Sequence, residues 1–352
     1  MFPVAAAFAA LAVPLWLVPS ALPPALRAPA WHGHEMLFGY TVAVVAGFLV
    51  TRGPHAMPWM LLAAWIAGRA APLAPGPLAA VLGLAFPAAL LAAAAPPLVR
   101  GAKRWENRIV PAVVAALLAI DATWWAGALR LDPEVQRRAL LAGVDLFALL
   151  MLIVGGRALP AAVGGYLERR GIPRRDLIRR GYELPLAALV GGACLLDAFG
   201  LARGAGALSV AAALVTLVRV VPWQLHRTLA RPELWALALG YLWLIPGLLL
   251  KGIAQLTDIV PVTHTVHGVT IGALGTLTLT MMARTAVLQA RRPLEGFGDI
   301  GAAALMVSAA ALLRLAAPLA PAHQGALLWF GAGIWSAAFL VLFVRLVRIQ
   351  RR

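Results

Sequence analysis

The sequence from Leu78 to Leu98 reads LAAVLGLAFPAALLAAAAPPL, an apolar run without one charged side chain, and Arg100, Lys103 and Arg104 follow it. A transmembrane helix needs about 20 predominantly apolar residues to cross the hydrocarbon core of a bilayer. Arginine and lysine just beyond such a run are typical of a loop that stays on the cytoplasmic side. This stretch therefore predicts a membrane-spanning helix followed by a cytoplasmic loop, and the rest of the chain repeats the pattern.

The composition of the whole chain excludes an ordinary soluble enzyme. Of 352 residues, 62% are apolar and 12% are charged, whereas soluble domains carry about a quarter charged residues. The net charge of +16 does not indicate nucleic-acid binding, because the basic residues are scattered between apolar blocks and form no continuous stripe. Cys194 is the only cysteine, which excludes an intrachain disulfide and a site built on several thiolates.

A scan for apolar segments predicts an all-α polytopic membrane bundle of about twelve transmembrane helices in one domain over residues 1–352. The expected spans are 3–20, 33–51, 57–75, 78–98, 109–129, 139–158, 183–201, 205–223, 234–255, 262–287, 299–319 and 326–347. Most arginines and lysines lie in the even-numbered connections, so we expect both termini on the cytoplasmic side of a bacterial inner membrane. The largest inner loop is a basic segment over residues 164–181.

Four of the seven histidines are expected at one level of the membrane, near the outer face. His32 and His34 open the second predicted helix, and His264 and His267 open the tenth. The i, i+3 spacing of His264 and His267 lets two imidazoles serve one metal or two adjacent cofactors. His32 and His34 point in nearly opposite directions on a helix, so either each serves a different cofactor or only one is a ligand.

A row of glycines follows His264 on the tenth helix, and two interpretations of it stay open. Gly268, Gly272 and Gly275 form a stripe with almost no side chains. Such a stripe admits either a closely packed helix or the face of a planar macrocycle. Glu35, next to His34, is either a first-turn acid favoured by the helix dipole or a group for proton transfer or metal binding.

Further charges are predicted inside the apolar spans. Arg69, Lys251 and Arg314 either extend toward the membrane surface or pair with the carboxylates of a buried cofactor, such as haem propionates. Ionised aspartates within a membrane are costly unless they are paired, and they occur at positions 121, 145 and 197.

Several motifs resemble those of the NnrS family, polytopic membrane proteins associated with the response to nitric oxide and described as containing haem and copper. The first is Trp31-His-Gly-His-Glu-Met-Leu-Phe-Gly39 with Gly47-Phe-Leu-Val-Thr51, and the second is His267-Gly-Val-Thr-Ile-Gly-Ala-Leu-Gly-Thr276 ending at Met282-Ala-Arg284. Shorter matches are Ala67-Gly-Arg69, Gly155-Gly-Arg157 with Pro160, Arg219 with Pro222-Trp223, and Leu239-Gly-Tyr241.

The resemblance implies a b-type haem and nitric oxide as the small-molecule ligand, in the context of nitrosative stress and denitrification. From their shared membrane level and the glycine stripe, we expect one haem between the second and tenth helices, with ligands from His34 or His32 and from His267 or His264, and with partners for its propionates among Arg69, Lys251 and Arg314. A copper ion would use those histidines that the iron leaves free, together with Glu35. The chain departs from the family pattern after Arg284, where Val287-Leu-Gln-Ala-Arg291 contains no histidine, so haem is favoured over copper.

The plan of twelve helices with histidines on the second and tenth is also similar to the pseudo-threefold catalytic subunit of haem–copper oxidases, although the sixth and seventh helices contain no histidine. This architectural analogy does not establish catalysis. The sequence therefore leaves open whether the protein catalyses haem-dependent nitric oxide redox chemistry or senses the gas. A membrane transporter without redox catalysis is the alternative function, and the oligomeric state is not predicted.

Overall fold

The computed structural model describes residues 1–50, 56–101, 105–172 and 180–351. Within these ranges the chain is helical and contains no strand, which confirms the all-α fold class. Arg52, Lys103, Arg104 and residues 173–179 of the expected basic loop lie outside the described residues. The chain divides into two compact units, Met1–Leu146 and Phe147–Arg352, and each is described by itself.

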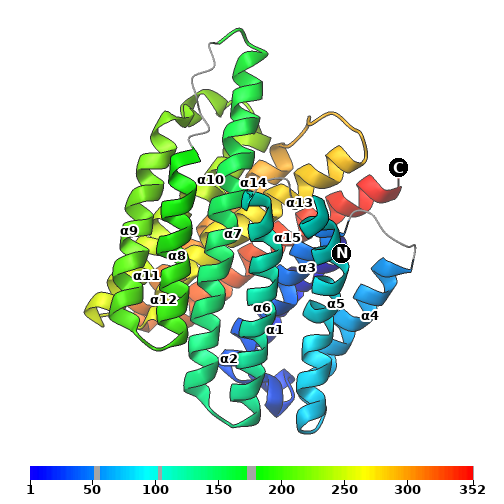
Figure 1. Cartoon of the computed structure of the whole chain (residues 1–352), viewed down its shortest axis with the longest axis vertical. Coiled ribbons are helices and arrows are strands. Elements are labelled where there is room, and N and C mark those ends of the chain that lie inside the picture. The colour runs from blue at the N-terminus through cyan, green and yellow to red at the C-terminus, as the bar shows by residue number, and fades with distance from the viewer. Residues whose placement is uncertain (51–55, 102–104, 173–179, 352) are drawn as a thin grey trace. The chain divides into compact units, whose positions relative to one another are not determined.

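The first unit holds the N-terminal helices and the first part of a long helix that continues into the second unit (Figure 1). Its α-helices are α1 Phe2–Trp16, α2 Pro29–His34, α3 Val42–Leu49, α4 Met57–Ala70, α5 Pro77–Gly101, α6 Trp105–Leu129 and α7 Pro133–Glu168. A π-helix, η3 Glu35–Thr41, joins α2 to α3. Short 3-10 turns lie at Pro19–Ala21, Pro24–Leu26 and Ala71–Leu73.

The second unit contains the remaining helices, and it too includes a π-helix, η8 Gly268–Gly275, between α12 and α13. The α-helices are α8 Glu183–Ala198, α9 Ala202–Val220, α10 Pro232–Leu242, α11 Leu244–Thr257, α12 Val262–Thr265, α13 Thr276–Gln289, α14 Gly298–Ala316 and α15 Gln324–Arg351. Short 3-10 turns lie at Arg180–Tyr182, Val221–Trp223, Leu225–Thr228, Ala317–Leu319 and Pro321–His323.

Eight helical stretches of the described residues are long and apolar enough to cross a membrane. They are Pro77–Pro96, Val110–Leu129, Pro133–Glu168, Ala202–Trp223, Pro232–Thr257, Val262–Gln289, Gly298–Leu319 and Pro321–Arg351. The other four predicted spans are also helical, but α1, α4 and α8 are 15, 14 and 16 residues long, and the span at 33–51 is divided by η3. The protein is a polytopic membrane protein, while the count of about twelve and the oxidase-like arrangement stay predictions.

The helix ends follow local chemistry that the sequence already carries. The side chain of Asp132 accepts hydrogen bonds from the backbone N–H groups of Glu134 and Val135 at 3.0 and 3.1 Å, which caps the start of α7 at Pro133. Helix α8 ends near Gly200, whose φ of +76° is a left-handed conformation that glycine adopts without steric cost. These signals explain why the connections of α6–α7 and α8–α9 are short.

Tryptophan side chains fill the core of the first unit. Trp31, Trp124 and Trp125 are buried together with small alanines from α5 and α7. The indole of Trp125 lies against Gly83, where an added Cβ would be 2.3 Å from the ring. A side chain at position 83 would therefore displace this ring, so the glycine is required for the close packing of α5 and α6.

Small residues bring α9 and α11 of the second unit into close contact. An added Cβ on Gly206 would lie 2.8 Å from the carbonyl oxygen of Gly252, and one on Gly252 would lie 2.6 Å from that of Gly206. Such contacts are typical of membrane helices, where small residues let two backbones approach. In Figure 1 the helices α8, α9 and α11 accordingly run side by side.

Candidate functional site

Each of the two histidine-bearing segments continues directly into a π-helix. Residue Glu35, which begins η3, follows His34, and residue Gly268, which begins η8, follows His267. A π-helix is rare because its i→i+5 hydrogen bonds are less favourable, and it occurs frequently at functional sites. Both candidate segments therefore carry the same unusual backbone, which the hydropathy pattern does not reveal.

His34 is fully buried in the first unit, and both of its ring nitrogens face carboxylates. Nε2 lies 2.8 Å from Oδ1 of Asp121 on α6, and Nδ1 lies 3.3 Å from Oε1 of Glu35. The imidazole also stacks on the indole of Trp124 at a centroid distance of 4.0 Å. A metal ion would have to displace one of the two carboxylates before it reached a ring nitrogen of His34.

Glu35, beside His34, also forms an ion pair with Arg69. Oε2 of Glu35 lies 2.7 Å from Nη1 of Arg69 on α4. The guanidinium occupies the space beside Gly39, where an added Cβ would lie 1.6 Å from the same Nη1. The motifs that contain Gly39 and Arg69 thus meet in one ion pair, and Arg69 has a protein carboxylate as its partner.

His32 has different surroundings from His34, two residues further along the chain. Its side chain is only partly buried, and its ring stacks on the indole of Trp16 from α1 at a centroid distance of 4.6 Å. The two histidines therefore point to different neighbours, as their i, i+2 spacing predicts.

In the second unit His264, His267 and Arg314 lie together. Nδ1–H of His267 donates a hydrogen bond to the carbonyl oxygen of His264 at 3.1 Å. Nδ1 of His264 lies 3.3 and 3.4 Å from the two Nη atoms of Arg314 on α14. No described carboxylate forms an ion pair with Arg314. The group therefore combines two imidazoles with one cation, whereas His34 lies among anions.

The glycine stripe is filled by protein groups. An added Cβ would lie 2.9 Å from Cα of Gly247 at position 268, 2.5 Å from the indole of Trp243 at position 272, and 2.6 Å from the indole of Trp335 at position 275. Trp243 is held by a hydrogen bond from its Nε1 to Oγ of Ser308 at 2.9 Å. Of the two interpretations of the stripe, close helix packing is the one that this structure supports.

Lys251 is completely buried and is paired inside the protein. Its Nζ lies 2.8 Å from Oδ2 of Asp197 on α8 and 3.4 Å from Oγ of Ser209. Gln255 donates from Nε2 to the other oxygen of Asp197 at 2.6 Å. The sequence singles out both Lys251 and Asp197, but it does not show that they neutralise each other.

A second polar cluster joins Arg157 and Arg219, from two of the shorter motifs, through Glu183, and the sequence alone did not identify it as a cluster. Arg157 forms a bidentate ion pair with Glu183, at 2.9 Å from Nε to Oε1 and 2.8 Å from Nη2 to Oε2. Arg219 lies 3.9 Å from the same carboxylate and donates to the carbonyl oxygens of Leu152 and Gly156 on α7. The only available signal was that intramembrane arginines need partners.

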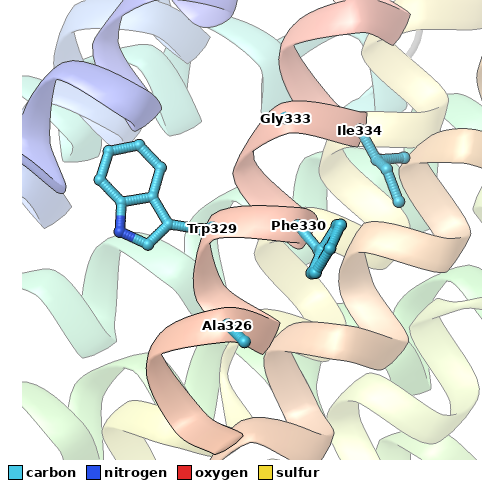
Figure 2. A pocket seen from close by; sticks show the side chains of 5 residues that line it. All are labelled: Ala326, Trp329, Phe330, Gly333 and Ile334. Carbon is cyan, nitrogen blue, oxygen red and sulfur yellow. The ribbon is translucent and has the colours of Figure 1, made fainter.

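Among the described residues, no group of three or more His, Cys, Asp or Glu side chains is arranged to hold a metal ion. A shallow hollow on α15 has a volume of about 350 Å³ and is lined by Ala326, Trp329, Phe330, Gly333 and Ile334, the residues labelled in Figure 2. All five residues belong to one helix and none is titratable. This hollow offers no charged group to a substrate, and an apolar helix face is expected where α15 meets lipid.

Comparison with known families confirms the resemblance that the motifs carry. One family model, described as NnrS protein, matches residues 1–352 and so covers the whole chain. No curated protein matches the chain.

Proposed function

Because this chain belongs to the NnrS family, we propose that it binds haem within the membrane and takes part in the response to nitric oxide. When bound, haem supplies an iron that accepts imidazole ligands and nitric oxide. The residues of the chain would then provide an imidazole ligand to the iron, neutralise the propionates and exclude competing ligands.

His267 is the residue whose geometry best supports the role of an axial ligand, and this single observation carries the proposal. Its Nδ1–H is donated to the carbonyl oxygen of His264. That hydrogen bond fixes the tautomer in which Nε2 carries the lone pair, and it orients the ring, as is common for histidines that bind metals. In the first unit, both ring nitrogens of His34 face carboxylates, so a metal ion would have to displace one of them.

Arg314 is the best candidate partner for a haem propionate. A propionate at the edge of the membrane needs a cation or hydrogen-bond donors to avoid a large desolvation cost. Lys251 is paired with Asp197 and Arg69 with Glu35, whereas Arg314 contacts a histidine and forms no ion pair with a described carboxylate. The proposal does not extend to copper, because the described donors do not form a copper site.

A visible spectrum of the purified, haem-supplied protein tests the proposal. We expect a Soret band that changes when the reduced protein is mixed with nitric oxide. A folded preparation that stays colourless after haem addition would overturn the proposal and would favour the alternative of a membrane transporter. Circular dichroism on the same sample establishes that the helices are present.

A further inference from the structure

Two arginines of the second unit lie over one tyrosine ring, and two further arginines are electrostatically linked to this group at the ends of three helices. The guanidinium carbons of Arg170 and Arg231 lie 5.4 and 6.0 Å from the ring centroid of Tyr166. Arg231 precedes α10, and Tyr166 lies in the last turn of α7. We define the Arg284 cluster as these three residues together with Arg284, which interacts electrostatically with Arg231, and with Arg169 and Glu233, which interact electrostatically with Arg284.

Positive charge exceeds negative charge in the Arg284 cluster. Glu233 is its only carboxylate, and it is paired with Arg231 at 2.6 Å from Nε to Oε1. Even if the exposed Glu168 beside Arg169 is counted, four arginines face two carboxylates. Nη2 of Arg231 donates to the carbonyl oxygen of Leu294 at 3.0 Å. Arg231 therefore has few N–H groups left to donate to a further anion. The excess charge lies mainly on the other three arginines.

Arg284 is the member of the cluster that most needs a ligand. Its Nη1 is buried and has no hydrogen-bond partner among the described residues. Arg284 interacts with one favourable charge, that of Glu233, and with two unfavourable ones, those of Arg169 and Arg231. A buried N–H group without a hydrogen-bond partner, such as those on Nη1 of Arg284, costs free energy that an anion can recover.

The position of the cluster along the helices indicates the source of that anion. The apolar stretches Pro133–Glu168, Pro232–Thr257 and Val262–Gln289 each have one end at the Arg284 cluster. The ends of membrane-spanning helices lie at the level of the lipid headgroups, and basic pockets between such ends bind anionic headgroups. Planar guanidinium groups also match the geometry of phosphate oxygens.

We propose that the Arg284 cluster is a binding site for a phosphate group, supplied by the headgroup of an anionic phospholipid or by free phosphate. The guanidinium of Arg284 donates to the phosphate oxygens from the buried side, while Arg169 and Arg170 neutralise the same charge from the exposed side. This site is independent of haem, because it uses neither the candidate histidines nor Arg314. It gives Arg284, which belongs to a family motif, a role that haem binding does not explain.

The test uses the full chain, delipidated in detergent, and measures bound lipid by native mass spectrometry with added phosphatidylglycerol or phosphatidylcholine. We expect phosphatidylglycerol to bind with higher affinity, and Arg284→Gln to weaken that binding about tenfold, the effect of losing charge-assisted hydrogen bonds. Arg170→Gln, which changes an exposed residue and is expected to fold normally, should weaken it severalfold. Arg348→Gln, an exposed arginine on α15 outside the cluster, is the matched control and should bind as the wild type does.

Inorganic phosphate distinguishes the two sources. If millimolar phosphate displaces the lipid or raises the unfolding temperature of the wild type but not of Arg284→Gln, the site takes free phosphate as well. If phosphate has no effect while phosphatidylglycerol binds, the ligand is the lipid headgroup. Equal binding of both lipids, or wild-type phosphatidylglycerol binding by both Arg284→Gln and Arg170→Gln, would overturn the proposal.

Discussion

His34 in the first unit and His267 in the second unit stand in the same local position, since each is followed directly by a π-helix. Their surroundings differ in charge. His34 is fully buried between two carboxylates, whereas His267 is partly buried and donates Nδ1–H to a backbone carbonyl near His264 and Arg314. A histidine in such a motif is therefore not by itself a metal ligand. The groups that face its ring nitrogens decide whether a nitrogen is already hydrogen-bonded or can still bind a metal.

The largest effect is expected at the carboxylate that faces His34. Replacing Asp121 with leucine leaves the buried imidazole without a partner for Nε2, and breaking a buried pair in this way costs about 3–5 kcal/mol. Asp121→Asn keeps an oxygen acceptor at the same place, so its free energy of unfolding should fall clearly less. Chemical unfolding in detergent measures both variants. Equal, small losses would show that the His34 contacts are not what stabilises the first unit.

The buried pair of the second unit should show strong coupling. Lys251→Met leaves Asp197 charged in an apolar environment, at a cost of about 3 kcal/mol, although Gln255 still donates to it. The double variant Lys251→Met with Asp197→Leu removes both charges and should recover most of this loss. A double-mutant cycle on unfolding free energies measures the coupling. Additive losses would show that Lys251 and Asp197 do not stabilise each other, and haem loss already in the single variant Lys251→Met would indicate that Lys251 binds a propionate instead.

A smaller effect is expected where Arg69 approaches the backbone. Gly39→Ala places a methyl group where Nη1 of Arg69 lies, so the guanidinium must move away from Glu35. Overpacking of this kind costs about 1–3 kcal/mol. The matched control is Gly191→Ala on α8, where an added Cβ meets no atom within 4 Å and alanine favours the helix by up to about 1 kcal/mol. If the two substitutions change stability equally, the contact between Gly39 and Arg69 is not tight.

The smallest effect concerns the two arginines near the compared histidines. Arg314→Gln removes a cation that we assign to a propionate, and the midpoint potential of bound haem should shift by tens of millivolts, where about 59 mV is a tenfold change for one electron. Arg69→Gln removes a cation already paired with Glu35, so it should alter stability more than potential. Redox titration of both variants checks that Arg314→Gln shifts the midpoint potential more than Arg69→Gln does. The reverse order would place the propionate near Arg69.

Apolar run length predicted most helical segments, because membrane spanning requires long apolar stretches without charge. It did not predict the break between α10 and α11 at Trp243 or the two π-helices, since hydropathy does not report which backbone groups are bonded. Nor did it predict that His34 pairs with Asp121 and Lys251 with Asp197, which lie 87 and 54 residues away in the chain. The glycine stripe was visible in the sequence, whereas the indoles of Trp243 and Trp335 that fill it depend on tertiary packing.

The comparison of the two histidines is tested most directly by haem spectra of two variants. His267→Gly and His34→Gln are purified with added haem, and spectra are recorded before and after adding imidazole, which can replace a missing axial ligand. We expect His267→Gly to lose the wild-type Soret position and to recover it with imidazole, while His34→Gln keeps the wild-type band. A wild-type spectrum for His267→Gly, together with an imidazole-dependent band for His34→Gln, would contradict the account.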